Sequence, residues 1–375
     1  GRNWYKHLRG LIMSFPGVTV MHSFADQCLF RITEEDGETM LVVVYVDDIL
    51  DMSKEGSTMR KRFYVYLNAH VPIKDFGQIE EVDFLGTTIH QSQGSVTITS
   101  PRHISELAAK YGMPGGVHMA YTVPVAEDLP TLVEDAKEGR ETVDNTLEKT
   151  FAGLVCTMLY IGSTTRPDIM YGVGMLTRCL TCPTKPLMRA AERIMYYLEN
   201  TKHLGLRYTA DTAQQAQHGS YACTKVTGMS DANHAVKRST SGRCFDAGGK
   251  AVVSYGMKKQ ASVAISTAEA EINAASEAAS EAVHLAGIHA DAGFPLNGPV
   301  VLYLDNKAAI DMAHDPTHLT KAKHIKRRSF FVRELVEDKQ VEVQYVRSED
   351  NTADIFTKPL KKRSFLKHRA RLLNM

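Results

Sequence analysis

A pair of adjacent aspartates between two apolar, extended segments constrains the fold of this chain more than any other feature. The first segment, residues 40–44, is apolar and rich in β-branched side chains, which predicts a strand buried on both faces. The second, residues 49–52, continues an extended and mostly apolar pattern. Little room remains for a loop, so a tight β-hairpin is predicted at Tyr45-Val46-Asp47-Asp48, with both carboxylates in the turn.

The two carboxylates of this hairpin suggest a metal site. Carboxylate and carbonyl oxygens are the hard ligands that Mg²⁺ prefers. Asp47 and Asp48 therefore suit an enzyme that clamps the attacking and leaving oxygens of a phosphoryl transfer between metal ions. The alternative interpretation is an ordinary Asp-Asp turn between two strands.

Composition indicates a globular chain of two or three domains, since 375 residues with 43% hydrophobic and 23% charged residues can form proper cores. The formal net charge is only +1, but residues 127–149 are acidic whereas 321–328 and 358–371 are basic. Six irregularly placed cysteines favour a reducing compartment. The longest apolar run, residues 40–46, is far shorter than the ~20 residues of a membrane-spanning helix. We therefore expect no membrane partner and no secretion.

The pattern along the chain changes twice. Residues 1–125 mix strands and helices, and the Pro- and Gly-rich, acidic stretch 113–147 is predicted to be a loop or linker. Helices are predicted over 151–163, 167–179 and 187–200. From Leu204 the order becomes three strands, a long alanine-rich helix and then alternating strands and helices, which is typical of a mixed sheet covered by helices.

Four further acids stand where such a sheet would gather them. Three follow or end predicted strands and one lies early in the alanine-rich helix; they are Asp231, Asp305, Asp354 and Glu271. Strand ends and helix starts share one edge of an α/β sheet, where ligand sites form. Individually each acid is also a common turn former or helix-dipole partner. Glu269 is a rival to Glu271, but two positions along a helix it would face another direction.

Several ordered blocks resemble copia-type retrotransposon Pol polyproteins. The Tyr45-Val46-Asp47-Asp48 segment looks like the polymerase box of reverse transcriptases. The other matching blocks are Arg2-Asn3-Trp4-Tyr5, Ala25-Asp26-Gln27-Cys28-Leu29-Phe30, Asp83-Phe84-Leu85-Gly86, Thr165-Arg166-Pro167-Asp168-Ile169, Ser230-Asp231-Ala232, Leu304-Asp305-Asn306 and Ala353-Asp354-Ile355-Phe356-Thr357-Lys358-Pro359-Leu360. The resemblance therefore runs from Arg2 to about Leu360.

The resemblance implies an α/β (α+β) fold in three parts. Residues 1–125 would be a partial reverse-transcriptase palm with the hairpin, truncated at its N-terminus. Residues 126–203 would be a linker and a helical thumb or connector. Residues 204–375 would be a ribonuclease H-like mixed sheet with flanking helices. The family location would be the cytoplasm, within a virus-like particle in an active element, or the nucleus.

The resemblance also implies the site residues and their ligands. Asp231, Glu271, Asp305 and Asp354 would hold two Mg²⁺ or Mn²⁺ ions and cleave RNA in an RNA–DNA hybrid, and family similarity favours Glu271 over Glu269. Asp47 and Asp48 would be metal ligands of the polymerase, with deoxynucleotides as substrates only in the full-length polyprotein. The hybrid or template–primer duplex would contact Tyr45, Val46, Lys323, His324, Arg327 and Arg328. His324 is also a candidate for proton transfer.

Departures from the family pattern leave a second interpretation open. Asn233-His234 replaces a usual aromatic, Lys326 replaces an acid, and His284 replaces a tryptophan. A third polymerase aspartate is carried in the family by a strand that precedes Trp4, so we expect no polymerisation by the chain as given. The alternative is a decayed, inactive element that only binds nucleic acid.

Overall fold

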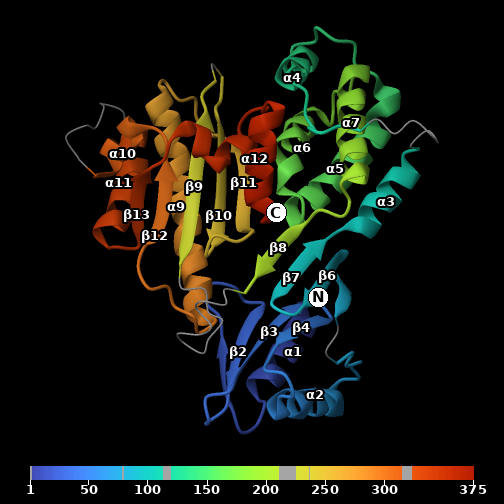
Figure 1. Ribbon diagram of the computed structural model, residues 1–375, viewed down its shortest axis with the longest axis vertical. Coiled ribbons are helices and arrows are strands. Elements are labelled where there is room, and N and C mark those ends of the chain that lie inside the picture. Colours follow the sequence, from blue (N-terminus) through green and yellow to red (C-terminus); the bar gives the residue numbers. More distant parts are fainter. Residues whose placement is uncertain (1, 78–79, 113–119, 211–224, 236, 315–322) are drawn as a thin grey trace. The chain divides into compact units, whose positions relative to one another are not determined.

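The computed structural model describes residues 2–77, 80–112, 120–210, 225–235, 237–314 and 323–375, with the side chains of 323–326 excluded. These residues form two compact units (Figure 1). The first comprises Gly1–Ile79 and Val283–Asn297, and the second comprises Glu80–Tyr221, Lys225–Ala282 and Gly298–Met375. In the parts of the chain that the structure describes, no helix is long and apolar enough to cross a membrane.

The first unit is an antiparallel sheet packed against two helices. Its strands pair in the order β1 (Thr19–His22), β2 (Leu29–Thr33), β3 (Thr39–Tyr45) and β4 (Asp48–Met52). Helices α1 (Arg2–Met13) and α2 (Thr58–His70) complete it. Apolar residues of both helices meet the inner face of the sheet in one core, for example Ile12, Phe63 and Val42, all fully buried. This burial holds the sheet on which the hairpin is built.

The predicted hairpin is present. Its strand β3 is buried on one face of the sheet and partly exposed on the other. Tyr45 pairs with Asp48, so Val46 and Asp47 are the two turn residues between β3 and β4. Along β3 buried residues alternate with partly exposed ones up to Val44. The expectation of a strand buried on both faces was therefore wrong, because in this antiparallel sheet α1 and α2 supply the core of one face only.

The second unit begins with a four-stranded antiparallel sheet in the order β5 (Glu81–Phe84), β6 (Thr87–Ser92), β7 (Ser95–Thr99) and β8 (Leu206–Thr209). Helix α3 (Pro101–Lys110) follows β7 along the chain. Leu85 and Gly86 form the turn between β5 and β6, both with positive φ (51° and 69°). A side chain at Gly86 would collide with the ring of His103. Strands β5 and β6 are thus joined by a primed turn.

The helical segment between β7 and β8 contains more helix than the sequence predicted. The structure has α4 (Leu129–Lys137), α5 (Glu148–Thr164), α6 (Met170–Leu176) and α7 (Lys185–Asn200), joined by short 3₁₀ turns at Asn145–Leu147, Pro167–Ile169 and Thr177–Cys179. Helix α4 lies inside the stretch predicted as a loop. It forms because Leu129, Val133 and Ala136 present a buried face at helical spacing, and Pro130 sits in its first turn, where proline is tolerated.

The remaining strands form a mixed five-stranded sheet accompanied by helices, the pattern predicted from Leu204 onward. Its order is β11 (Val252–Lys259), β10 (Thr240–Ala247), β9 (Val226–Asn233), β12 (Val300–Leu304) and β13 (Val341–Tyr345). The first three strands are antiparallel, and β12 lies parallel to both β9 and β13. The helices that follow its strands are α9 (Thr267–Asp291), α10 (Lys307–His314), α11 (Lys323–Glu337) and α12 (Lys362–Leu373).

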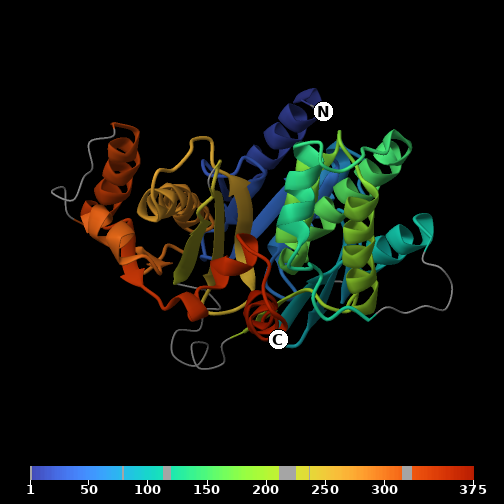
Figure 2. The ribbon, with the colours of Figure 1, turned by 90° about the horizontal axis from the view of Figure 1, so that it is seen from above.

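Helices flank this sheet at both edges (Figures 1 and 2). Helices α10 and α11 pack beside β13, while α6 packs on β11 and α12 lies nearby. Buried residues of α5–α7 and of the last thirty residues belong to a single core that includes Phe151, Tyr197, Phe356 and Leu372. Strand β8 pairs with β7, although residues 204–375 were assigned to the nuclease part. The three-part division of the chain stays a prediction.

Candidate active site

Three carboxylates from separate elements meet at one edge of the five-stranded sheet. Asp231 lies on β9, Asp305 directly follows β12, and Asp354 lies in the 3₁₀ segment Thr352–Phe356 (η6). Because β9 and β12 run parallel, their carboxyl ends reach the same edge. One oxygen from each of the three carboxylates lies within 4.8 Å of the others. This group is called the acid cluster below.

The segment that carries Asp354 is fastened to β9 by side-chain hydrogen bonds. The Asn351 amide donates to the Ser230 carbonyl at 2.9 Å, and its oxygen accepts from the Ala353 amide at 3.1 Å. The Thr357 hydroxyl donates to Asp231, and the Asn233 amide donates to the Thr357 carbonyl at 3.2 Å. Asn233, which departs from the family pattern, therefore helps to join the strand of Asp231 to the segment of Asp354.

Glu271, on α9, is not among the three acids whose oxygens lie within 4.8 Å of one another, but it is close enough for the charges of Asp231 and Asp305 to act on it. Glu269 has a different role. Glu269 accepts a hydrogen bond from the Ile265 amide at 2.7 Å, while the Ser266 hydroxyl accepts from the Glu269 amide at 3.1 Å. This reciprocal arrangement caps the start of α9. Glu271 is 6% exposed, and its Oε2 atom has no hydrogen-bond partner. The charges of Asp231 and Asp305 act on it directly.

Electrostatics at this edge disfavour negative charge in the absence of a cation. Burial, followed by the neighbouring carboxylates of Asp231 and Asp305, raises the pKa of Glu271 from 4.5 to about 9. Burial raises the pKa of Asp354 to about 7, with Asp231 adding to the effect. Burial also raises the pKa of Asp231, although the Thr357 hydroxyl opposes that shift. A bound divalent cation would reverse this balance.

Lys358 is a site residue that sequence reasoning missed. Its ammonium group lies 2.8 Å from an Asp354 oxygen, so one of the clustered charges is partly compensated. Asp231, Asp354 and Asp305 in turn raise the pKa of Lys358, although burial opposes them. Lys358 stands four residues after Asp354 in the matched block 353–360, so the only available signal was its position in that block.

The chemistry of the donors fits a hard divalent cation. All four acids offer carboxylate oxygens, and the Glu271 Oε2 atom is buried without a hydrogen-bond partner. Mg²⁺ and Mn²⁺ prefer such oxygen donors to nitrogen or sulfur. An orphaned buried carboxylate oxygen costs free energy unless a proton or a cation meets it. The acid cluster with Glu271 is therefore the strongest candidate metal centre among the described residues.

The hairpin carboxylates are arranged differently. Asp47 and Asp48 are exposed at the tip, and among the described residues no third acid, histidine or cysteine completes a metal-binding group with them. The indole of Trp4 donates a hydrogen bond to the Val46 carbonyl at 2.7 Å, which holds the tip against α1. Val46 has φ of 56°, a conformation that a β-branched residue adopts only under strain. Such strain is frequent at functional turns.

The predicted nucleic-acid contacts are only partly visible. Tyr45 and Val46 are 52% and 57% exposed at the hairpin tip. Arg327 is exposed and Arg328 is half-buried on α11. Lys323 and His324 lie in the first turn of α11, but their side chains are outside the described residues. The nucleic-acid-binding roles of all six residues stay predictions.

Comparison with known proteins finds a family model and several relatives that match this chain. Residues 1–126 match the family model for reverse transcriptase (RNA-dependent DNA polymerase). The retrovirus-related Pol polyprotein from transposon TNT 1-94 of Nicotiana tabacum is 26% identical over 97% of this chain and 26% of its own length. The corresponding polyprotein from transposon RE1 of Arabidopsis thaliana is 27% identical over 97% of this chain and 23% of its own length. The chain thus spans about a quarter of the length of these relatives.

A solved structure of the foamy viral protease–reverse transcriptase in complex with double-stranded DNA is similar over 92% of this chain and 49% of its own. The sequence identity is 15% and the TM-score is 0.43. The fold assignment above rests instead on the strand order of the five-stranded sheet.

Proposed function

We propose that this chain, which belongs to the family of copia-type retrotransposon Pol polyproteins, cleaves the RNA strand of RNA–DNA hybrids at its acid cluster. The observation that carries the proposal is the meeting of Asp231, Asp305 and Asp354, with their oxygens within 4.8 Å. The unpartnered Oε2 atom of Glu271 supports a cation at the same place. Such a set of acids is what a two-metal nuclease requires.

Each residue of the cluster has a role in this proposal. Asp231, Asp305, Asp354 and Glu271 would hold two Mg²⁺ or Mn²⁺ ions. When bound, the two ions supply an activated water and stabilise the departing 3′ oxygen. Lys358, paired with Asp354 in this structure, offsets negative charge that accumulates beside the phosphodiester. The Thr357 hydroxyl orients the Asp231 carboxylate.

Basic residues beyond the cluster would bind the hybrid. Arg327 and Arg328 lie on α11 together with Lys323, His324 and Lys326, so five of six consecutive positions carry a basic or titratable residue. Phosphate contacts of this kind bind without reading the base sequence. The 2′-hydroxyl of the RNA strand would distinguish it from DNA.

The hairpin belongs to a second proposed activity. Asp47 and Asp48 would act in RNA-directed DNA synthesis, with deoxynucleotides as substrates, in the full-length polyprotein. The match of residues 1–126 to the reverse transcriptase family supports this role. Their exposure at the tip of a strained turn is compatible with contact to a template–primer duplex.

The nuclease proposal is tested with the Asp231→Asn variant of the full chain. A neutral amide is a weaker metal ligand, so cleavage of a labelled RNA–DNA hybrid in Mg²⁺ should fall at least ~100-fold. Asp246→Asn is the matched control, because Asp246 lies on neighbouring β10 and is not part of the acid cluster. It accepts hydrogen bonds from the Thr227 hydroxyl and the Gly249 amide. Undiminished cleavage by Asp231→Asn would remove Asp231 from the site. Hybrid binding without any cleavage by the unmodified chain would favour the alternative, an inactive nucleic-acid-binding element.

A further inference from the structure

A fully buried ion pair lies in the helical segment that precedes the nuclease sheet. Arg166 and Asp168 are 0% exposed in their side chains and are joined by two parallel hydrogen bonds of 3.0 and 2.9 Å. Arg166 also donates to the carbonyl and hydroxyl oxygens of Thr201 at 3.0 and 2.8 Å. Burying both charges carries a desolvation cost that only such complete pairing offsets. The pair is therefore a fixed point in the second unit.

This fixed point is connected to the last helix of the chain. The Tyr197 hydroxyl donates to Asp168 and accepts a hydrogen bond from Arg369 of α12 at 3.1 Å. The Tyr197 ring also packs edge-on against Phe365 of α12, with centroids 5.9 Å apart. Tyr197 is fully buried and Phe365 is 3% exposed, so helix α12 is held to α7 by both a polar and an apolar contact.

Helix α12 in turn holds the segment that carries Asp354. Lys367 donates to the Glu349 carbonyl at 2.5 Å and to an Asp350 oxygen at 2.6 Å. The next residue of the same helix is His368, and its Nδ1 atom lies 3.4 Å from the Thr352 hydroxyl. Asp354 follows two residues later within η6. A 3₁₀ segment of five residues has too few internal hydrogen bonds to fix its own position.

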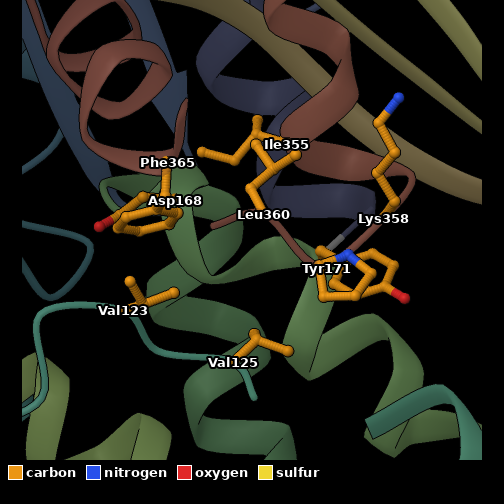
Figure 3. A pocket seen from close by; sticks show the side chains of 9 residues that line it. Val123, Val125, Asp168, Tyr171, Ile355, Lys358, Leu360 and Phe365 are labelled. Carbon is orange, nitrogen blue, oxygen red and sulfur yellow. The ribbon is translucent and has the colours of Figure 1, made fainter. Parts of the chain in front are cut away.

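Apolar side chains fill the space around this connection. Figure 3 shows Val123, Val125 and Tyr171 of the helical segment around the same small pocket as residues that follow Asp354. Those residues are Ile355, Lys358, Leu360 and Phe365. Asp168 lines the same pocket. The segment carrying Asp354 and Lys358 is thus packed on the helical segment, as well as on the sheet.

We propose that Asp168 is a positioning residue for Asp354, acting through Tyr197 and Arg369 on helix α12. The inference rests on the proposed nuclease function, because it assigns to Asp354 a metal that needs accurately placed ligands. Asp168 touches neither substrate nor metal; it fixes the helix to which η6 is attached. Outer residues that orient a metal ligand typically change metal affinity about 10- to 100-fold when altered.

The test is Tyr197→Phe in the full chain, which deletes one hydroxyl and leaves the ring packed on Phe365. Tyr64→Phe is the matched control, because the Tyr64 hydroxyl likewise donates to a carboxylate, Asp51, at 2.7 Å but lies in the first unit. Hydrogen–deuterium exchange of residues 349–358 should accelerate in Tyr197→Phe and stay unchanged in Tyr64→Phe. The Mg²⁺ concentration for half-maximal cleavage should rise about 10-fold in Tyr197→Phe alone.

A second pair of variants separates positioning from a general loss of stability. Arg369→Lys keeps a donor and a positive charge on α12, so exchange at residues 349–358 should stay close to that of the native chain. Arg369→Met should accelerate this exchange as Tyr197→Phe does. Unchanged exchange at 349–358 in both Tyr197→Phe and Arg369→Met would overturn the inference, as would equal acceleration throughout the second unit. If the unmodified chain does not cleave hybrids, the proposed function fails, and the exchange pattern still decides whether the connection from Asp168 through Tyr197 to Arg369 positions Asp354.

Discussion

Replacing Glu271 with glutamine should stabilise the metal-free protein at neutral pH. The buried carboxyl has its pKa raised from 4.5 to about 9 by burial first and by Asp231 and Asp305 next. At pH 7 the folded state must therefore keep a proton that the unfolded chain releases. The interval of ~2.5 pH units, at about 1.4 kcal/mol per unit, gives an upper value of ~3.5 kcal/mol. Glutamine avoids this cost, because it is neutral in both states.

The sign of the pH dependence makes the prediction specific. Below pH 4.5 Glu271 is protonated in both states, so glutamate and glutamine should give similar free energies of unfolding. As pH rises toward 9, the folded state binds more protons than the unfolded state, and the native protein loses stability. The advantage of Glu271→Gln should therefore grow across this interval and reach a melting temperature roughly 5 °C higher at pH 7.

The assay is thermal and urea unfolding in EDTA at pH 5, 7 and 9. Glu269→Gln is the control on the same helix, because Glu269 is also buried but caps α9 through the Ile265 amide. That variant should lose stability, since it removes a negative charge near a helix N-terminus. With Mg²⁺ added, the difference in stability between Glu271→Gln and the native protein should shrink or change sign, because the native site binds the ion better. A metal-free Glu271→Gln protein that is less stable than the native one at pH 7 and 9 would refute the reasoning.

Three further outcomes follow from the structure. Mg²⁺ at about 100 times its dissociation constant should stabilise the native chain by ~2.7 kcal/mol, and the gain in melting temperature should be absent in Asp305→Asn. Val46→Gly should raise the urea midpoint by the equivalent of about 1 kcal/mol, because glycine tolerates φ of 56°; a lower midpoint would contradict strain at the tip. Asp168→Asn should cost about 3–5 kcal/mol in urea unfolding followed by circular dichroism, since Arg166 would stay buried without its partner; a cost below ~1 kcal/mol would contradict that account.

Much of the fold and of the acid cluster could be predicted from local patterns. The β-hairpin at Asp47 and Asp48 follows from two short extended runs with no room for a loop. The preference for Glu271 over Glu269 followed from family similarity, and helical spacing indicated that the two side chains face different directions. The structure gives Glu269 a capping role. The edge position of Asp305 follows from its place after a buried strand.

What could not be predicted depends on contacts that the local sequence pattern does not reveal. Lys358 lies beside Asp354 because the chain turns at this point, where the Thr357 and Lys358 amides donate to the Asp354 carbonyl, and a single lysine in a basic tail carries no signal of that turn. Helix α4 was not predicted, because its proline and acidic surroundings indicated a loop and its buried face depends on neighbours that the local sequence does not show. The pairing of β8 with β7 joins residues more than a hundred positions apart. Strand pairing over such separations leaves no local trace.

The hydrogen bond between Trp4 and the hairpin tip has a practical consequence. Trp4 is the only tryptophan of the chain, and its indole is bound to the carbonyl of Val46, beside the two turn carboxylates. Intrinsic tryptophan emission therefore reports on the β3–β4 hairpin of the first unit, and the second unit contains no tryptophan. Circular dichroism, in contrast, averages over both compact units. Divergence of the two signals during denaturation would reveal, without any label, whether the units lose their structure in one step or in two.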